Sequence, residues 1–274
     1  MPELPEVETI KNELLPHIVG RRISGVTLSW DGIVRQPSAE EFRSYLIGRT
    51  IVGLARRGKY LIFNLNSDES LIVHLRMTGS LLLKPALAES ERFIRAIIYL
   101  DNGTGLYFRD SRKLGRMWLT KDTNSIISKL GPEPLEADFT PEILAHRLKN
   151  RSAPIKAILC DQSFIAGIGN MYADEALFAA GIHPLRSAKS LSWDEVERLY
   201  SAIQRVLWAA IGNKGASVDT YVRPGGELGT AHFQFQVAHC LSGKSCPVCG
   251  TPIERIPIRN RGSYFCPKCQ PIKA

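Results

Sequence analysis

The chain begins with Met1-Pro2-Glu3-Leu4-Pro5-Glu6-Val7-Glu8, a stretch that favours the start of a helix. Proline fits the first turn of a helix, and carboxylates stabilise its positive N-terminal end. The apolar residues that follow recur at helical spacing. We therefore expect a helix over residues 5–15, ended by Pro16 and Gly20.

The same stretch supplies a candidate nucleophile. Proline at position 2 is small enough for Met1 to be removed, which would leave a secondary amine beside Glu3. Such an amine can attack an electrophilic carbon and form a Schiff base. An ordinary α-amine has a pKa of about 7.7–8.0, so an appreciable fraction is neutral near pH 7. The sequence thus pairs the amine of Pro2 with the carboxyl group of Glu3.

The middle of the chain changes from strand to helix. Residues 22–121 read mostly as short strands, with a hairpin signal at Asp101-Asn102-Gly103, and such a pattern predicts an antiparallel sandwich. A connector with two prolines follows at residues 130–135. Ser192 and Glu195 form a capping box for the last helix. The expected strands include residues 22–30, 51–66, 71–77 and 95–109, and the expected helices are 141–149, 153–161, 170–180 and 193–213.

Two Cys-x-x-Cys pairs near the end of the chain are separated by 16 residues. This spacing is typical of four thiolates that close a tetrahedral zinc site. A four-cysteine site has no open position for water, so we expect one structural zinc ion. Cys160 and Cys240 are expected to be packed or inert thiols. The predicted ligands are Cys246, Cys249, Cys266 and Cys269.

Composition favours a polyanionic partner. Lys and Arg total 35 against 27 Asp and Glu, which gives a net charge of +8. No apolar run is long enough to span a membrane, and the acidic start excludes a signal peptide. We therefore expect a cytoplasmic protein with reduced cysteines and no membrane partner.

Residues 154–180 contain a pattern that suits an anion. A helix is expected to enter a tight turn with Gly167 and Gly169, after which Asn170 caps a second helix. Glycine before an exposed helix N-terminus lets backbone N–H groups approach a phosphate. A simple helix hairpin with Asn170 as its N-cap is the alternative.

These blocks together resemble the bacterial formamidopyrimidine-DNA glycosylases, in the order in which that family carries them and over nearly the whole chain. The resemblance implies a multidomain α+β fold. Its parts are an N-terminal catalytic β-sandwich flanked by helices (1–130), a linker and helical domain (131–232), and a zinc finger (233–274). The helical domain would hold a helix–two-turns–helix motif and a lesion-covering loop. The matching blocks are residues 2–8, 56–61, 74–79, 109–113, 130–135, 166–175 and the four cysteines.

The resemblance also implies an activity, that of a bifunctional DNA glycosylase and AP lyase of base excision repair. Such an enzyme flips oxidised purines, 8-oxoguanine and formamidopyrimidines, out of double-stranded DNA. It excises them through a Schiff base with Pro2 and then cleaves the strand by β,δ-elimination. A bacterial monomer that reaches the nucleoid through its DNA is expected.

Catalytic roles follow from the resemblance for Pro2, Glu3, Lys59 and Arg261, with support from Glu6 and Glu175. Glu3 would be the general acid–base and would act on the sugar ring oxygen. Lys59 would donate a proton in β-elimination, and Arg261 would act in δ-elimination and bind phosphate. Both cations could instead be phosphate clamps alone.

DNA contacts are implied for a further set of side chains. Met77 and Arg112 would fill the gap left by the flipped base, and Arg112 would read the orphaned cytosine. A buried core methionine is the alternative reading of Met77. The implied contacts are Met77, Arg112, Leu114, Arg151, Lys156, Asn170 and His74.

Three departures from the family pattern stand out. Leu114 replaces the usual phenylalanine and should stack less well on bases, which would weaken lesion search. Phe93 and Arg95 stand where relatives carry a histidine pair, so that DNA contact stays open. Residues 237–240 read Val-Ala-His-Cys instead of Val-Tyr-Gly-Arg. The loop over 216–232 matches the segment that covers the flipped base in relatives, but it is too variable to assign the specificity for a lesion.

Two other functions remain as alternatives. The first is an endonuclease VIII-like glycosylase for oxidised pyrimidines, although Leu4 and the stretch 74–77 resemble the purine branch more closely. The second is a non-catalytic zinc-ribbon protein that binds damaged DNA. Simple binding does not require Pro2, so its presence with Glu3 argues against this second alternative.

Overall fold

The computed structural model describes residues 1–86, 92–239 and 241–272, so Cys240 lies outside the described residues. The chain forms two compact units, one of residues 1–128 with 213–230 and one of residues 129–212 with 231–274. In the described part of the chain, no helix is long and apolar enough to cross a membrane.

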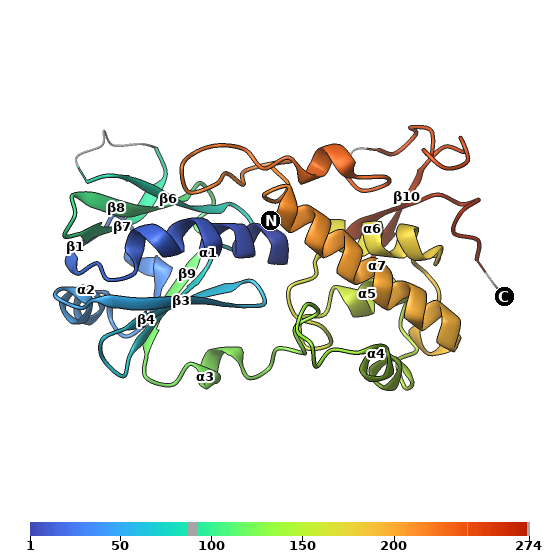
Figure 1. Cartoon of the computed structure of the whole chain (residues 1–274). Helices are drawn as coiled ribbons and strands as arrows, with labels where there is room; N and C mark the ends of the chain where they lie inside the picture. The colour runs from blue at the N-terminus through green and yellow to red at the C-terminus, as the bar shows by residue number, and fades with distance from the viewer. Residues whose placement is uncertain (87–91, 240, 273–274) are drawn as a thin grey trace. The chain divides into compact units, whose positions relative to one another are not determined.

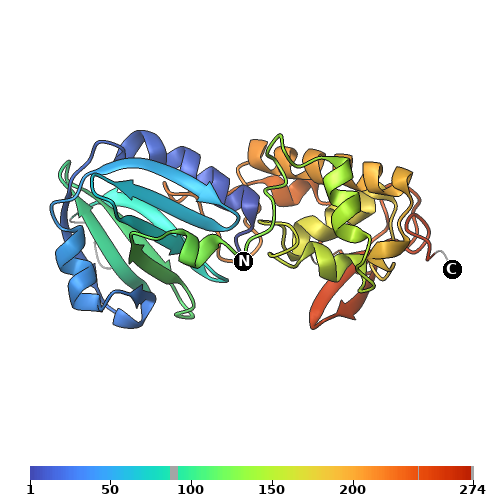
Figure 2. The same cartoon turned by 90° about the horizontal axis from the view of Figure 1, so that it is seen from below.

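The first unit contains two sheets, as the alternation of short strands and turns predicts (Figures 1 and 2). Among the described residues of this unit, all strand pairs are antiparallel except β2 with β9, which are parallel. The hairpin signal at residues 101–103 joins β7 to β8, with Gly103 at φ +78°. One sheet has the order β1 (Ile23–Leu28), β7 (Ile94–Leu100), β8 (Thr104–Asp110), β6 (Gly79–Pro85). The other has the order β2 (Val34–Gln36), β9 (Arg116–Thr120), β5 (Ser70–His74), β4 (Tyr60–Leu65), β3 (Ile51–Arg57).

Helix α1 (Leu4–Ile18) begins one residue before the expected start and continues three residues beyond the expected end. Pro16 lies inside the helix, so the prediction that it ends the helix is wrong. A proline in the last turn removes one hydrogen bond, whereas the continuation buries Ile18 completely. Gly20, at φ +83°, then turns the chain away. The remaining helical segments of this unit are η1 (Asp31–Ile33), α2 (Ala39–Leu46) and α3 (Asn124–Ile127).

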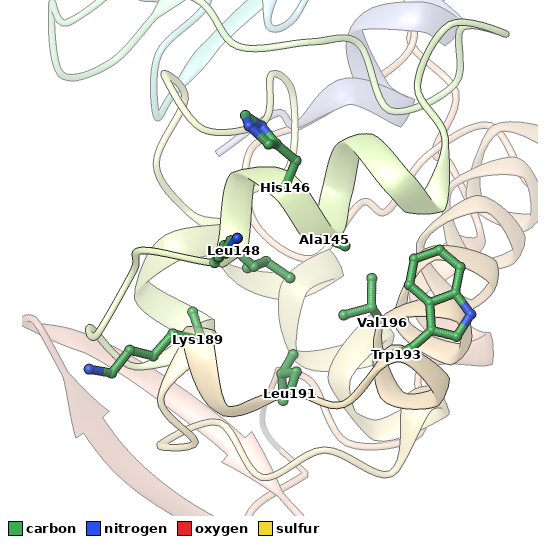
Figure 3. Close-up of a pocket in the computed structure, with 9 residues that line it drawn as sticks. Ala145, His146, Leu148, Lys189, Leu191, Trp193 and Val196 are labelled. Carbon is green, nitrogen blue, oxygen red and sulfur yellow. The ribbon is translucent and has the colours of Figure 1, made fainter.

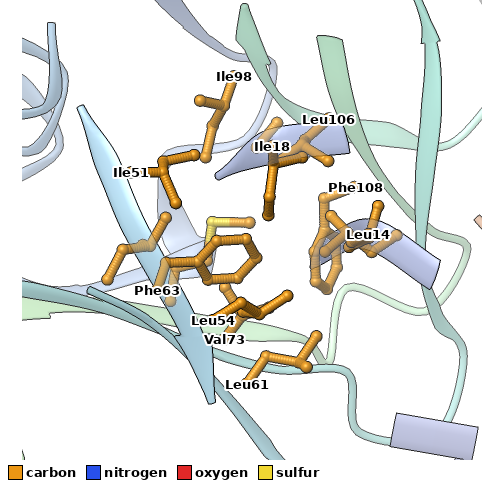
Figure 4. Packing of buried hydrophobic residues seen from close by; sticks show 14 of the residues in the cluster. Leu14, Ile18, Ile51, Leu54, Leu61, Phe63, Val73, Ile98, Leu106 and Phe108 are labelled. Carbon is orange, nitrogen blue, oxygen red and sulfur yellow. The ribbon is translucent and has the colours of Figure 1, made fainter. Parts of the chain in front are cut away.

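The core of the first unit lies between the sheets and α1. Leu14 and Ile18 of α1 join Phe63 of one sheet and Phe108 of the other in a single buried cluster (Figure 4). Burial of such side chains stabilises the unit by roughly 1.5–3 kcal/mol each. This packing fixes α1, and with it the position of its first residues.

The second unit is mainly helical, and its longer helices lie within the predicted ranges, although the helix expected over residues 153–161 covers only 155–159. The capping box is confirmed, because the Ser192 N–H donates to Glu195 Oε2 at 3.0 Å and the Glu195 N–H donates to Ser192 Oγ at 3.3 Å. Helix α6 is buried on nearly every face, as expected of a central helix. The helices are α4 (Pro141–Leu148), α5 (Ile155–Leu159), α6 (Asn170–Ala180), η2 (Ala188–Ser190), α7 (Trp193–Gly212) and η3 (Ala231–Gln234), followed by strands β10 (Glu254–Ile258) and β11 (Arg261–Phe265).

Candidate active site and nucleic-acid interface

The first residues of the chain are held in place by a carboxylate of their own helix. Pro2 and Glu3 are buried directly before α1, while Met1 is exposed. Glu6 Oε2 accepts a hydrogen bond of 2.7 Å from the Glu3 N–H, which satisfies one of the donors that a helix start leaves unpaired. The side chain of Glu6 therefore orients the segment that carries the candidate nucleophile.

Glu6 also reaches a loop far along the chain. Its Oε1 accepts a hydrogen bond of 2.8 Å from the Ala216 N–H, and Gly215 takes φ +77° beside it. A Cβ on Gly215 would lie 3.0 Å from the Glu6 side chain, so the close approach depends on glycine. One buried carboxylate thus joins the start of α1 to the loop over 213–230.

Lys59 lies in the turn between β3 and β4, and it is buried. His74, which pairs with Tyr60 across the sheet, is also buried, and its Nδ1 accepts a hydrogen bond of 2.9 Å from the Arg76 N–H. Burial, reinforced by the charges of Arg76 and Lys59, lowers the pKa of His74 to about 3. His74 is therefore neutral near pH 7, and it fixes the turn before Met77 instead of offering a cation to phosphate.

Asp110 organises the two turns that carry Met77 and Arg112. Its buried carboxylate accepts hydrogen bonds from the Arg112 N–H at 3.1 Å and from the Leu114 N–H at 2.7 Å. It also accepts the hydroxyl of Thr78. A carboxylate that satisfies several backbone donors fixes a turn with little help from side-chain packing.

Met77 and Arg112 project from these turns. Met77 is 45% exposed, which excludes the alternative of a core methionine. Arg112 Nη1 lies 3.9 Å from Met77 Sδ, so the structure brings together the two side chains that the sequence analysis paired. Leu114 is partly buried beside Gly115, where a Cβ would come within 2.4 Å of Phe108.

The start of α6 differs from the sequence prediction in one respect. Gly169 is the N-cap, and Asn170 is the first helical residue, so the prediction that Asn170 caps the helix is wrong. The reason is a tertiary hydrogen bond, because Asn170 Nδ2 donates to the Gly262 carbonyl at 2.9 Å. Asn170 thereby lies beside the turn that carries the exposed Arg261. Gly167, at φ +86°, makes the preceding tight turn that was expected.

Lys156 and Arg151 occupy different environments. The side chain of Lys156 is only 1% exposed, and its ammonium forms an ion pair with Asp174 and donates to the Asn170 carbonyl at 2.9 Å. Two acceptors inside the unit hold the ammonium of Lys156, so its observed role is to join α5 to the start of α6. Arg151 is exposed after α4, so it is placed where a DNA contact is sterically open.

Glu175 binds backbone N–H groups of its own unit. Its buried carboxylate accepts the N–H groups of Gln236, Val237 and Ala238 at 2.8–3.0 Å. Burial raises the pKa of Glu175, and the three backbone donors oppose that rise. Glu175 therefore fixes residues 236–238, which overlap the start of the stretch 237–240 where this chain departs from the family pattern.

The four cysteines converge as their spacing predicts. Their Sγ atoms all lie within 4.8 Å of one another, with pairs at 3.4 Å (Cys249–Cys266) and 3.8 Å (Cys246–Cys269). A tetrahedral zinc ion with Zn–S bonds of about 2.3 Å requires sulfur separations of about 3.8 Å, so the donor set fits zinc. Cys246 and Cys266 are also part of a small apolar cluster with Phe178 of α6.

Zinc removal is expected to lower DNA affinity at least roughly 10-fold, because the hairpin that carries Arg261 loses its crosslink. Fluorescence anisotropy with a labelled duplex, before and after chelation, would measure this, with a colorimetric assay of the released zinc. Cys246→Ser should reproduce the loss, whereas Cys160→Ala, which removes a buried thiol outside the cluster, should not. Unchanged binding after complete zinc release would contradict the structural role.

A hollow of about 300 Å³ in the second unit lies between α4 and the start of α7 (Figure 3). Leu148 and Val196 form its apolar floor, and Trp193 stands at its edge. It contains none of the predicted site residues. The site residues of this unit instead gather at the start of α6 and on the β10–β11 hairpin.

Three contributors were missed in the sequence analysis as residues with a role of their own. Asp110 stands two residues before Arg112, a spacing that is typical of a side chain that caps its own turn, so this signal was available. Ala216 and Gly262 contribute backbone groups to Glu6 and Asn170, and no side-chain pattern announces such contacts.

Comparisons with known proteins agree with this arrangement. Three family models match successive parts of the chain: the formamidopyrimidine-DNA glycosylase N-terminal domain over 1–117, the formamidopyrimidine-DNA glycosylase H2TH domain over 130–222, and a zinc finger found in FPG and IleRS over 243–272. The formamidopyrimidine-DNA glycosylase of Chloroflexus aurantiacus is 45% identical over 273 residues, which are 98% of each chain.

Solved structures of DNA complexes are similar over the whole chain. A mutant of the Lactococcus lactis FPG bound to a Fapy-dG containing DNA has a TM-score of 0.92 at 35% identity and covers 99% of this chain and 100% of its own. The Lactococcus lactis Fpg bound to an abasic site containing DNA has the same TM-score and identity and covers 98% and 100%.

The fold, the cysteine cluster and the similarity to solved DNA complexes place the chain in the class of zinc-finger DNA glycosylases of base-excision repair. Within that class, the two models named for formamidopyrimidine-DNA glycosylase match residues 1–117 and 130–222. The chain belongs to the formamidopyrimidine-DNA glycosylase family, whose members have glycosylase and AP lyase activity. The resemblance noted in the sequence, the α+β fold, the zinc ion and the DNA partner are therefore confirmed.

Proposed function

We propose that this enzyme excises oxidised purines from double-stranded DNA with the N-terminal amine of Pro2 as nucleophile and then cleaves the strand. The observation that carries the proposal is the pair of hydrogen bonds made by Glu6. They tie the Pro2–Glu3 segment and the loop over 213–230 to one buried carboxylate. The nucleophile and the lesion-covering loop must keep fixed positions relative to each other, and a carboxylate that binds both provides this.

The reaction begins when the neutral amine of Pro2 attacks C1′ of the flipped nucleotide. A C–N bond forms, the bond from C1′ to the base breaks, and the proton that the attacking nitrogen loses goes to the departing base. Glu3 donates a proton to the sugar ring oxygen, the ring opens, and a cationic iminium remains on C1′. Because the amine is secondary, this iminium cannot lose an N–H proton and stays charged.

The iminium withdraws electrons and makes the C2′ proton acidic. Loss of that proton expels the 3′ phosphate, and a second elimination expels the 5′ phosphate, which leaves a one-nucleotide gap. Lys59 is placed in our proposal as the proton donor near the lesion phosphates, and Arg261 as the cation that binds the leaving phosphate. Glu6 and Glu175 support them as positioning residues.

Recognition of the lesion site is assigned to both units. Met77, Arg112 and Leu114 fill the gap beside the flipped base, and Arg112 donates hydrogen bonds to the unpaired cytosine. His74 acts indirectly, by fixing the turn before Met77. The backbone at the start of α6, with Asn170 and Arg151, binds phosphates.

We retain the division of the chain into residues 1–130, 131–232 and 233–274 as a proposal about roles: catalysis, DNA binding with coverage of the lesion, and zinc binding. We also propose that the enzyme acts as a monomer in the bacterial cytoplasm, where its zinc thiolates stay reduced. Action on oxidised pyrimidines is the second candidate, and product profiles on duplexes with either lesion separate the two.

Borohydride trapping tests the proposal directly. With a duplex that holds one 8-oxoguanine opposite cytosine, reduction of the iminium should give a stable covalent complex between protein and DNA. An oxidised pyrimidine and an abasic site serve as parallel substrates. A complex with the pyrimidine alone would shift the substrate class, and no complex with any of the three would overturn the mechanism.

A further inference from the structure

Phe93 adopts a conformation that its own side chain does not favour. Its φ is +72°, in the left-handed region that residues with a Cβ rarely occupy. The ring is nevertheless 42% exposed, so burial does not compensate for this backbone. Strained residues that gain no packing are found most often at sites that bind a ligand.

Specific contacts hold Phe93 in this position. Its carbonyl accepts a hydrogen bond of 2.9 Å from the N–H of Asp110, the residue that organises the turns of Met77 and Arg112. The guanidinium groups of Arg92 and Arg95 lie 5.1 and 5.7 Å from the centre of the ring. Arg95 Nε also donates to the Asp110 carbonyl at 2.8 Å. Phe93 is thus fixed to the framework that presents the wedge residues.

A hollow of about 460 Å³ opens beside the ring, entirely within the first unit. Arg92 and Arg109 supply cations to it, Thr78 and Ser111 supply hydroxyls, and the wall is completed by Asp219, Thr220 and Val222. Thr78 follows Met77 in sequence, and Ser111 precedes Arg112. An aromatic face with cations and hydroxyls beside it has the chemistry to hold a nucleotide.

We propose that the ring of Phe93 stacks on a base of the bound DNA. This base lies next to the flipped nucleotide and loses a stacking partner when that nucleotide leaves the helix. Arg92 and Arg109 bind the phosphate of the flipped nucleotide. Every base presents a π-face, so this contact is independent of sequence. Since position 114 is leucine in this chain, Phe93 provides an aromatic surface next to the wedge. The inference rests on the function proposed above.

The test compares Phe93→Ala with the parent enzyme, both loaded with zinc, on two duplexes. One holds a tetrahydrofuran abasic analogue opposite cytosine, and the other is undamaged. Phe93→Ala should weaken binding to the abasic duplex by about 5- to 100-fold and binding to the undamaged duplex by less than about 2-fold. Phe93→Trp should restore affinity, and 2-aminopurine placed beside the abasic position should be quenched by the parent and by Phe93→Trp only.

Tyr45→Ala is the matched control, because Tyr45 is an aromatic residue of similar exposure on α2 of the same unit. It should bind both duplexes as the parent does. The stacking role would be overturned if Phe93→Ala bound the abasic duplex with the affinity of the parent, or if it lost affinity equally for both duplexes.

Phe93→Gly separates binding from folding, since glycine adopts a positive φ without strain. Its thermal midpoint should equal or exceed that of the parent while its affinity for the abasic duplex falls. A lower midpoint would show that the ring serves packing and would overturn the inference. Failure of the parent to form a borohydride adduct would instead refute the proposed function, whereas an adduct combined with unchanged Phe93→Ala affinity would refute the stacking role alone.

Discussion

Replacing Pro2 by glycine is expected to lower the single-turnover rate of base excision by roughly 10³-fold or more, with little change in affinity for a lesion duplex. A chain that begins with glycine still carries an α-amine, so the expected loss comes from the orientation of this amine and from the charge of the intermediate that it forms. The proline ring fixes the direction of the nitrogen lone pair, and a flexible glycine loses that orientation. The primary amine of glycine also gives a protonated imine, which can lose its N–H proton and become neutral.

The comparison requires that both proteins begin at residue 2, which intact mass spectrometry of the purified chains establishes. Rates come from single-turnover kinetics on an 8-oxoguanine duplex, and affinities from a duplex with an abasic analogue that cannot react. If affinity fell as far as rate, Pro2 would be a binding residue and the nucleophile assignment would be wrong.

Glu3→Gln is expected to lower excision of the damaged base by about 10²- to 10⁴-fold, the range for loss of a general acid–base. Glutamine keeps the shape of the buried Glu3 side chain, and the hydrogen bond from the residue 3 N–H to Glu6 is unaffected. An abasic site already contains an open-chain aldehyde fraction, so it bypasses ring opening. Borohydride trapping on an abasic duplex should therefore fall much less than excision.

The control for Glu3→Gln is Glu8→Gln, a change at an acid of the same helix that pairs with Lys11 and Arg56. That variant should excise the base at nearly the parent rate. Equal losses of excision and abasic trapping in Glu3→Gln would show that the residue orients Pro2 and does not act on the sugar.

Features that depend on neighbours along the chain were predicted from sequence. The Cys-x-x-Cys pairs converge on one point, and the capping box of Ser192 and Glu195 forms as expected. The turn at Gly103 joins its two strands for the same reason. In each case a few residues fix both the geometry and the partners, so the pattern suffices.

The end of α1 and the start of α6 show where such local reasoning fails. Pro16 signals a helix end, but burial of Ile18 in a distant core outweighs one lost hydrogen bond. Asn170 has the side chain of an N-cap, but a carbonyl of the hairpin at Gly262 binds its amide. The intrinsic preference of a residue is small compared with a tertiary contact.

The sequence by itself determined the family and the zinc ligands, and it indicated Pro2 as a candidate nucleophile and Met77 with Arg112 as a candidate wedge. Tertiary structure alone decided that Glu6 joins residues 3 and 216, that Asp110 holds two turns, that Lys156 is buried against Asp174, and that Phe93 stays exposed. These contacts join groups far apart along the chain, many of them backbone groups that every residue carries. Only the packing of the core decides which of them meet.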